Sequence, residues 1–223
     1  MSISLEKHDG VALIGLDDGK ANAINPAWMR QFLEVLDEAE ADAGAIVLHG
    51  RPGVFSGGFD LKWMVSANMD DIGELLDVAG ILFNRVYGSP KPVVAACTGH
   101  AIAAGAFLLL ACDTRLATRG EFMFGANETI NNMKLPVFAV ELMKARLDPR
   151  RLTEAMVQAK MYAAEEAQQV GWFDQLLDAE EVLPAALATA ELLAQLPPEA
   201  YAYNKLALRQ PTIDTIAATE AGY

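Results

Sequence analysis

Apolar residues follow two different spacings along the first half of the chain. Short apolar runs next to turn-forming residues are typical of strands. Such runs occupy residues 3–5, 11–16, 45–48, 93–97, 114–117 and 122–124, and most of them adjoin a glycine, aspartate or proline. Between them, helical spacing predicts helices over residues 26–39 and 61–87, the second interrupted near 68–71, and residues 104–112 form an apolar segment typical of a buried helix. This alternation predicts an α/β fold in which parallel strands are covered by helices.

The beginning of the chain carries a turn signal and a helix-start signal. The sequence His8-Asp9-Gly10 is a turn signal between the first two strands, which we expect to form an edge hairpin. Pro26 suits the first turn of the following helix, and Asn25 is expected to cap it.

The second half of the chain has a different pattern. From Pro136 onward nearly every segment has helical spacing, over residues 136–147, 149–159, 164–170, 180–196 and 199–208. We therefore predict a core of sheet and helices over residues 1–135 and a helical region over residues 136–223 that continues it.

Composition narrows the class of protein. The chain has 223 residues, of which 52% are hydrophobic and 21% charged, so it suits a packed globular domain. Its 17 Lys and Arg against 30 Asp and Glu give a net charge of -13, which argues against nucleic acid as a partner.

The cysteines and the hydropathy bear on the compartment. Cys97 and Cys112 both lie in apolar segments, so we expect buried free thiols and no disulfide or metal site. The N-terminus has no basic region followed by an apolar core, and the longest apolar run, residues 101–112, is too short to span a bilayer. We therefore expect a cytoplasmic protein with no membrane partner.

Two short stretches have the composition of a site that binds an oxygen atom. Residues 55–62 read FSGGFDLK, residues 99–113 read GHAIAAGAFLLLACD, and each follows an apolar strand. Their small residues allow a backbone N–H to turn outward. In the second stretch, the N–H groups near Ala104 and Gly105 would be free donors in the first turn of a helix, at the positive end of its dipole. Two such N–H groups from separate segments form an oxyanion hole.

These stretches, together with KANAIN at residues 20–25 and FGANE at residues 124–128, resemble the signature segments of the crotonase superfamily, or enoyl-CoA hydratase/isomerase family. Members of this family stabilise the enolate of an acyl-CoA thioester. The resemblance covers nearly the whole chain. It implies the ClpP/crotonase-like α/β fold, a superhelix of strand-strand-helix turns with a C-terminal helical region that packs subunits into a homotrimer or a hexamer of two trimers.

The resemblance also implies roles for single residues. It places the two oxyanion-hole donors on the N–H groups of Phe59 and Ala104. It implies that coenzyme A binds as part of the substrate, with no permanently bound cofactor, against the backbone of Ala21, Ala23, Ile24 and Gly57. Lys62 could meet a phosphate or be a solvated surface lysine. Because the net charge is negative, a local basic patch must attract coenzyme A, and Lys20, Arg51 and Lys62 are the candidates.

The acid-base group decides the reaction. The family's hydratases use two glutamates, of which the later falls on Glu128 and the earlier on Phe107, three residues after Ala104. A phenyl ring carries no proton, so the sequence favours the shift of a double bond from 3-enoyl-CoA to 2-enoyl-CoA, with Glu128 as the single acid and base. We expect apolar neighbours such as Phe124 and Met133 to raise the pKa of Glu128.

Other readings stay open. One is an enoyl-CoA hydratase, or another enolate reaction such as hydrolysis or decarboxylation, with a different group in place of the missing glutamate. Another is a catalytically idle acyl-CoA-binding homologue. We expect structural roles for Asp60, His100 and Asp113. Ser56 does not fit the G-x-S-x-G motif of a hydrolase nucleophile, and no G-x-G-x-x-G or Walker loop is present.

Overall fold

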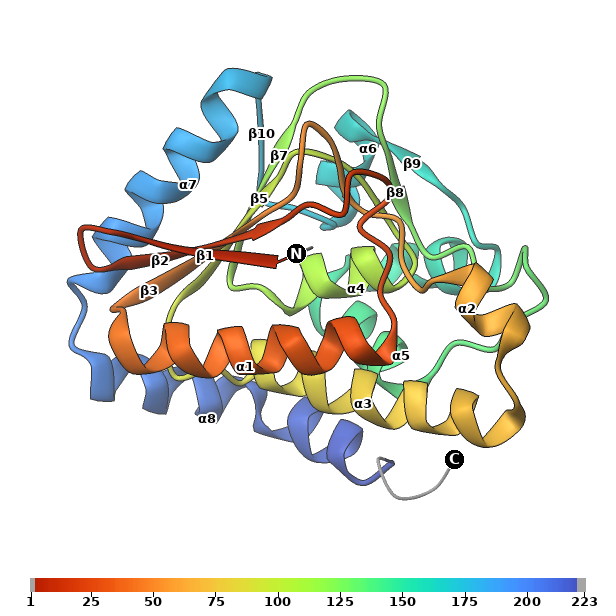
Figure 1. Cartoon of the computed structure of the whole chain (residues 1–223). Helices are drawn as coiled ribbons and strands as arrows, with labels where there is room; N and C mark the ends of the chain where they lie inside the picture. The colour runs from red at the N-terminus through yellow and green to blue at the C-terminus, as the bar shows by residue number, and fades with distance from the viewer. Residues whose placement is uncertain (1–2, 220–223) are drawn as a thin grey trace.

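The strands build two sheets in the computed structural model, which describes residues 3–219 (Figure 1). The larger sheet has the order β1-β2-β3-β5-β7-β10, with β1 and β2 antiparallel as the predicted hairpin and the other neighbours parallel. Its strands are β1 (Ile3–His8), β2 (Val11–Leu16), β3 (Ala45–His49), β5 (Val93–Cys97), β7 (Thr114–Thr118) and β10 (Gln175–Leu177). Strands β2 and β5 are buried along their whole length because both faces of the sheet are covered.

The smaller sheet has the order β4-β6-β8-β9. Its strands are β4 (Gly53–Ser56), β6 (Gly99–Ile102), β8 (Met123–Gly125) and β9 (Tyr162–Ala163). The first three are parallel to one another, and β9 is antiparallel to β8. Since β4, β6 and β8 follow β3, β5 and β7 along the chain, each pair contributes one strand to each sheet. The carboxyl ends of β4, β6 and β8 therefore lie at one edge of the smaller sheet.

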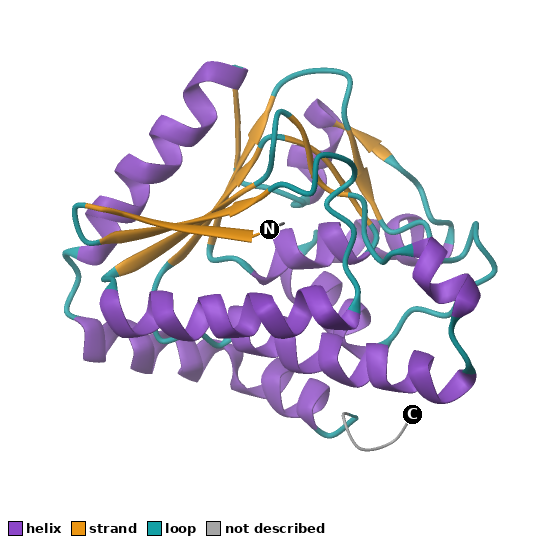
Figure 2. Cartoon of the chain, viewed as in Figure 1, coloured by secondary structure: helices purple, strands orange, loops and turns teal. Residues whose placement is uncertain are grey.

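Helices cover both faces of the larger sheet (Figure 2). Alternate residues of β3 face opposite sides: Ile46 and Leu48 face the main core, whereas Ala45 and Val47 pack beneath α7. On the other face, α1, α3 and α8 lie side by side in Figure 1, while α4 packs against α3 and α5, and α5 packs against α8. The helices are α1 (Pro26–Asp42), α2 (Leu61–Ser66), α3 (Met69–Tyr87), α4 (Ala104–Ala111), α5 (Val137–Arg146), α6 (Ala164–Val170), α7 (Ala179–Ala194) and α8 (Pro198–Ala217).

Several local predictions are confirmed. The side chain of Asn25 accepts a hydrogen bond from the N–H of Trp28 at 3.0 Å and so caps α1. The predicted interruption separates α2 from α3, where Asn68 and Asp71 form a capping box. All eight residues of α4 are buried. Cys97 and Cys112 are buried free thiols.

Three local predictions differ from the structure. Residues 149–159 form a 3-10 turn (Pro149–Arg151) and a π-helical turn (Thr153–Val157) in place of one helix. The region after Pro136 also contributes β9 and β10 as edge strands, which are too short to show a pattern in the sequence. Helix α8 continues through Pro211 to Ala217, because Ile213 and Ile216 pack against the core beyond the proline.

The predicted boundary at residue 135 between a core and a helical region stays a prediction. The first two residues of the core region, 1–2, and the last four of the helical region, 220–223, lie outside the described residues. Within residues 3–219, no helix combines the length and the apolar character that crossing a bilayer requires.

Candidate active site

The three residues predicted to catalyse follow the carboxyl ends of three neighbouring strands. Strand β4 ends at Ser56 and leads to Phe59, β6 ends at Ile102 and leads to Ala104, and β8 ends at Gly125 and leads to Glu128. The three strands are adjacent and parallel. The fold therefore brings all three residues to the same edge of the smaller sheet.

The N–H of Phe59 points away from the neighbouring chain segment. The carbonyl of Gly58 accepts a hydrogen bond from the N–H of Ile24 at 2.9 Å, and the N–H of Asp60 donates to the carbonyl of Ile24 at 2.8 Å. In a trans peptide the C=O and the N–H point in opposite directions, and residues 3–219 contain no cis peptide bond. The Phe59 N–H is therefore directed away from Ile24, and among the described residues it donates to no backbone carbonyl.

The N–H of Ala104 is the first donor of helix α4. Ala103 precedes it with a positive φ of 52° and a ψ of -126°, a backbone conformation that is strained for a residue other than glycine. The N–H of Ala103 donates to the carbonyl of Gly125 at 2.9 Å, so the start of α4 is tied to the end of β8. Since a first-turn N–H has no acceptor within its own helix, that of Ala104 is available to a ligand.

Two glycines allow the donor segments to touch. A Cβ atom at Gly58 would lie 2.9 Å from Cβ of Ala103 and 3.2 Å from the amide nitrogen of Ala104. A Cβ atom at Gly105 would lie 2.3 Å from the carbonyl oxygen of Ser56. Only glycine permits such close approach. The two glycine-rich stretches identified in the sequence are therefore in direct backbone contact.

Glu128 lies in the turn after β8 and is 5% exposed. Its carbonyl accepts hydrogen bonds from the N–H groups of Asn131 at 3.0 Å and Met133 at 2.9 Å, which fix the turn. Its Oε2 atom is buried and has no hydrogen-bond partner among the described residues. Burial raises the pKa of the Glu128 carboxyl to about 7, in the predicted direction. A buried carboxyl that titrates near neutrality suits a general base.

Phe107 belongs to the hydrophobic core. Its ring meets that of Phe83 edge-on, with centroids 6.5 Å apart, and that of Phe138 at 6.2 Å. The resemblance implies a second glutamate of the hydratases at this position, and here α4 holds a phenyl ring packed in the core.

The segments predicted to bind coenzyme A lie side by side. The N–H of Gly57 donates to the carbonyl of Ala21 at 2.8 Å, and both residues are exposed. Ala23 is half-buried and Ile24 is buried. A hollow of about 320 Å³ beside them is lined in part by Ala23 and Trp28. Ala21, Ala23 and Gly57 thus lie at one surface, and Ile24 lies beneath it.

The predicted cations lie around this surface. The Nε of Arg51 donates to the carbonyl of Lys20 at 2.7 Å, which joins two of the three. Lys62 is exposed on α2, where it forms no ion pair within residues 3–219. Asp60 caps α2 by accepting from the N–H of Lys62 at 3.0 Å, which confirms its structural role. His100 accepts from the N–H of Met123 at 3.0 Å and is structural as well.

Asn22 contributes a contact that sequence reasoning missed. Its side chain is buried, donates to the carbonyl of Leu16 at 2.8 Å and to that of Phe55 at 3.1 Å, and so joins the two segments. Its φ is 50°, a conformation that asparagine tolerates better than most residues. The cluster of Asp, Gly and Asn over residues 17–22 is the signal for such a loop.

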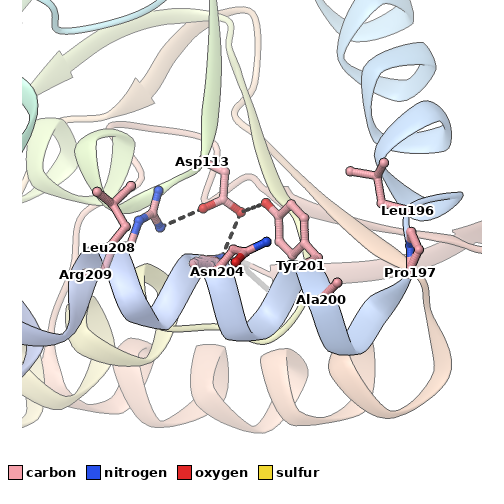
Figure 3. A pocket seen from close by; sticks show the side chains of 9 residues that line it. Asp113, Leu196, Pro197, Ala200, Tyr201, Asn204, Leu208 and Arg209 are labelled. Atoms are coloured by element: carbon pink, nitrogen blue, oxygen red, sulfur yellow. Dashed lines mark hydrogen bonds and ion pairs between the residues drawn. The ribbon is translucent and has the colours of Figure 1, made fainter.

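A second hollow, of about 390 Å³, lies elsewhere, between the start of β7 and the connection from α7 to α8 (Figure 3). Asp113 lines it and accepts hydrogen bonds from the hydroxyl of Tyr201 and the ammonium group of Lys205. None of the predicted site residues lines it. Within residues 3–219, no cluster of three or more His, Cys, Asp or Glu is arranged to hold a metal ion.

Comparison with known proteins gives consistent matches. Residues 6–221 match the family model described as enoyl-CoA hydratase/isomerase. A putative enoyl-CoA hydratase of Thermus thermophilus is 31% identical over 203 residues, which are 87% of this chain and 79% of that protein. The mitochondrial enoyl-CoA delta isomerase 1 of Homo sapiens is 28% identical over 207 residues, 91% of this chain and 68% of that protein.

Solved structures give the same result. A protein of Mycobacterium tuberculosis, called an enoyl-CoA isomerase in its apo structure, superposes with a TM-score of 0.93 at 37% identity, over 99% of this chain and 96% of that one. A second structure of the same protein calls it a probable enoyl-CoA hydratase. The predicted α/β crotonase fold is confirmed.

Proposed function

The chain belongs to the enoyl-CoA hydratase/isomerase family, and from this premise we propose that it converts a 3-enoyl-CoA to a 2-enoyl-CoA. The chain is an enzyme of this family, whose substrates are acyl-CoA thioesters. The finer assignment, isomerisation, rests on one observation: Glu128 is buried at the site edge, while the position of a second carboxylate is taken by the core residue Phe107.

The two N–H groups hold the thioester oxygen. Phe59 and Ala104 donate to the carbonyl oxygen of the substrate, whose negative charge grows as a proton leaves C2. The dipole of α4 adds to this stabilisation. Two observations support this role. Gly58 lies in close contact with Ala104, and the N–H groups of Phe59 and Ala104 donate to no backbone carbonyl among the described residues.

Glu128 moves the proton. Its carboxylate removes a proton from C2, the electron pair delocalises over the carbonyl and the C3–C4 double bond, and the same proton returns at C4. The double bond then lies between C2 and C3. One carboxyl group completes this cycle with no net gain or loss of a proton. A pKa of about 7 lets the group accept and donate at neutral pH.

The rest of the substrate lies along the coenzyme A surface. The backbone of Ala21, Ala23, Ile24 and Gly57 contacts its adenine and pantetheine parts, and Lys62 meets a phosphate. We propose a homotrimer or a hexamer of two trimers as the assembly, with residues 136–223 as the packing region. We also propose a cytoplasmic location, where the free thiols of Cys97 and Cys112 stay reduced.

A paired assay tests this function. Wild type and Glu128→Gln are each given a 3-enoyl-CoA and a 2-enoyl-CoA, and the absorbance of the conjugated thioester is followed. We expect wild type to gain absorbance with the 3-enoyl substrate, and Glu128→Gln to be slower by about 10²- to 10⁴-fold. Glu121→Gln, at an exposed glutamate just before β8, is the matched control and should keep the wild-type rate.

Other outcomes identify the alternatives. Loss of absorbance from the 2-enoyl substrate, with no gain from the 3-enoyl substrate, makes the enzyme a hydratase, as the name of the Thermus relative suggests for that protein. Tight binding without turnover of either substrate makes it a binding protein. Full isomerase rate in Glu128→Gln removes Glu128 as the base.

A further inference from the structure

The side chain of Ser56 joins two backbone segments of the site. Ser56 is fully buried at the end of β4. Its hydroxyl donates to the carbonyl of Asn22 at 2.8 Å and accepts from the N–H of Gly58 at 3.2 Å. The only donor of the hydroxyl is thus used within the protein, and one of its lone pairs accepts, so Ser56 is held in place by the backbone.

Ser56 also touches the segment that carries the other donor. A Cβ atom at Gly105 would lie 2.3 Å from the carbonyl oxygen of Ser56 and 2.7 Å from its Cβ. Gly105 is the second residue of α4, next to Ala104. Ser56 therefore packs against the first turn of α4 while its hydroxyl holds the loop that leads to Phe59.

The hydroxyl fixes the conformation of Gly58. This glycine has a φ of 92°, and glycine alone adopts this value freely. Its N–H is held by Ser56 and its carbonyl by the N–H of Ile24. Because the N–H and the carbonyl of Gly58 are both held, the plane of the peptide between Gly58 and Phe59 is fixed. This plane sets the direction of the Phe59 N–H. Without the hydroxyl, only the carbonyl end stays fixed.

We propose that Ser56 is a positioning residue for the oxyanion hole: its hydroxyl holds Gly58 so that the N–H of Phe59 points at the thioester oxygen. This inference rests on the proposed function. A donor held in place in advance stabilises the charged transition state more than the neutral substrate. Loss of the hydroxyl therefore lowers kcat more than it changes KM.

Kinetics of Ser56→Ala give the first test. We expect kcat to fall about 10- to 100-fold, with KM changed by less than about threefold. Ser66→Ala is the matched control, because the Ser66 hydroxyl also donates to a backbone carbonyl, that of Trp63 at 2.8 Å, but is exposed on α2. It should keep the wild-type kcat. Circular dichroism at the assay temperature checks that each variant is folded.

A spectroscopic test reports the oxyanion hole directly. A 3-ketoacyl-CoA has an enolate that absorbs in the near ultraviolet, and an oxyanion hole promotes this enolate in the bound state. We expect wild type and Ser66→Ala to produce the band, and Ser56→Ala to produce it only at higher pH. A purely structural role for Ser56 would lower the unfolding temperature and leave the band unchanged.

The outcomes separate the two hypotheses. If wild type binds the 3-ketoacyl-CoA and forms no enolate, the proposed function is wrong and the role of Ser56 falls with it. If wild type and Ser56→Ala form the band at the same pH, the positioning role alone is overturned. Should Ser56→Ala fail to fold, Ser56→Cys replaces it. A thiol has a shape similar to that of a hydroxyl but is a weaker hydrogen-bond donor and acceptor. The same band with Ser56→Cys at unchanged pH overturns the role, and a shift to higher pH supports it.

Discussion

The carboxylate of Asp113 accepts a hydrogen bond from the ammonium group of Lys205 at 2.8 Å, across 92 positions of the sequence. Its other oxygen forms an ion pair with Arg209 at 2.6 Å (Figure 3). The side chains of Lys205 and Arg209 are each 5% exposed. Asp113 also accepts from the N–H of Val93 at 2.7 Å. One carboxylate at the start of β7 thus holds α8 against the base of the larger sheet.

Asp113→Asn should lower the free energy of unfolding by about 3–5 kcal/mol, because it leaves two buried cations without a counter-charge. Urea denaturation followed by circular dichroism measures this loss. Asp42→Asn removes an exposed partner of Lys7 and should change stability little. Equal effects of the two substitutions would contradict a special role for the buried cluster.

Gly58→Ala should remove most catalysis while leaving a folded protein. The new methyl group would lie 2.9 Å from Cβ of Ala103 and would push the two donor segments apart. We expect kcat to fall by about 10²-fold or more. Gly10→Ala isolates backbone strain, since Gly10 has a φ of 85° but no atom within 4 Å of its Cβ position. This control should lose some stability and keep its kcat, and an equal loss of kcat in both variants would rule out the steric explanation.

Ala103→Gly should stabilise the protein. The φ of 52° is strained for alanine and ordinary for glycine, and the relief exceeds the entropic cost of glycine, for a net gain of about 1 kcal/mol. Ala104→Gly, one residue later in regular helix, should be destabilising instead. Thermal unfolding of the two variants measures these opposite signs, and a loss of stability in Ala103→Gly would show that the strain is negligible.

The strained backbone at Ala103 also marks the limit of prediction from sequence. Apolar runs and glycines are local signals, so they predicted that the segments of Phe59 and Ala104 follow strands. The roles of Phe59, Ala104 and Glu128 came from the family resemblance and stay predictions. Nothing in the sequence indicates an alanine with a positive φ. That conformation results from long-range contacts, in which Ala103 bonds to Gly125 and packs beside Gly58.

The apolar pattern missed strands β4 and β6 of the smaller sheet for a similar reason. Strands β4 and β6 have four residues each and begin with glycine, so their pattern is too short to separate from a turn. The chain leaves β3 for β4 at Gly50, where a Cβ atom would lie 2.2 Å from the carbonyl oxygen of Val54. Such a tight reversal is visible only once the strands are in place. The sequence also carries no sign that Asp113 pairs with Lys205 and Arg209, because these partners on α8 lie far from it along the chain.

Glu128 links the proposed chemistry to stability. Burial raises its pKa to about 7, so the folded chain holds a proton that the unfolded chain, whose glutamate titrates near 4.5, has already lost. Between pH 4.5 and about 7 the unfolded state therefore binds fewer protons than the folded state. The free energy of unfolding falls as pH rises through this window. Above pH 7 the ionised, buried carboxylate costs the folded state about 3 kcal/mol.

Glu128→Gln should therefore be more stable than wild type at pH 8 and similar to it near pH 4.5, because glutamine carries no charge at either pH. We expect the difference in free energy of unfolding to grow with pH by up to about 3 kcal/mol, measured by urea denaturation at several pH values. Glu121→Gln, at an exposed glutamate, should follow the wild-type curve. Parallel curves for wild type and Glu128→Gln would mean that the carboxyl is not desolvated, and the argument for a base poised near neutrality would fail with it.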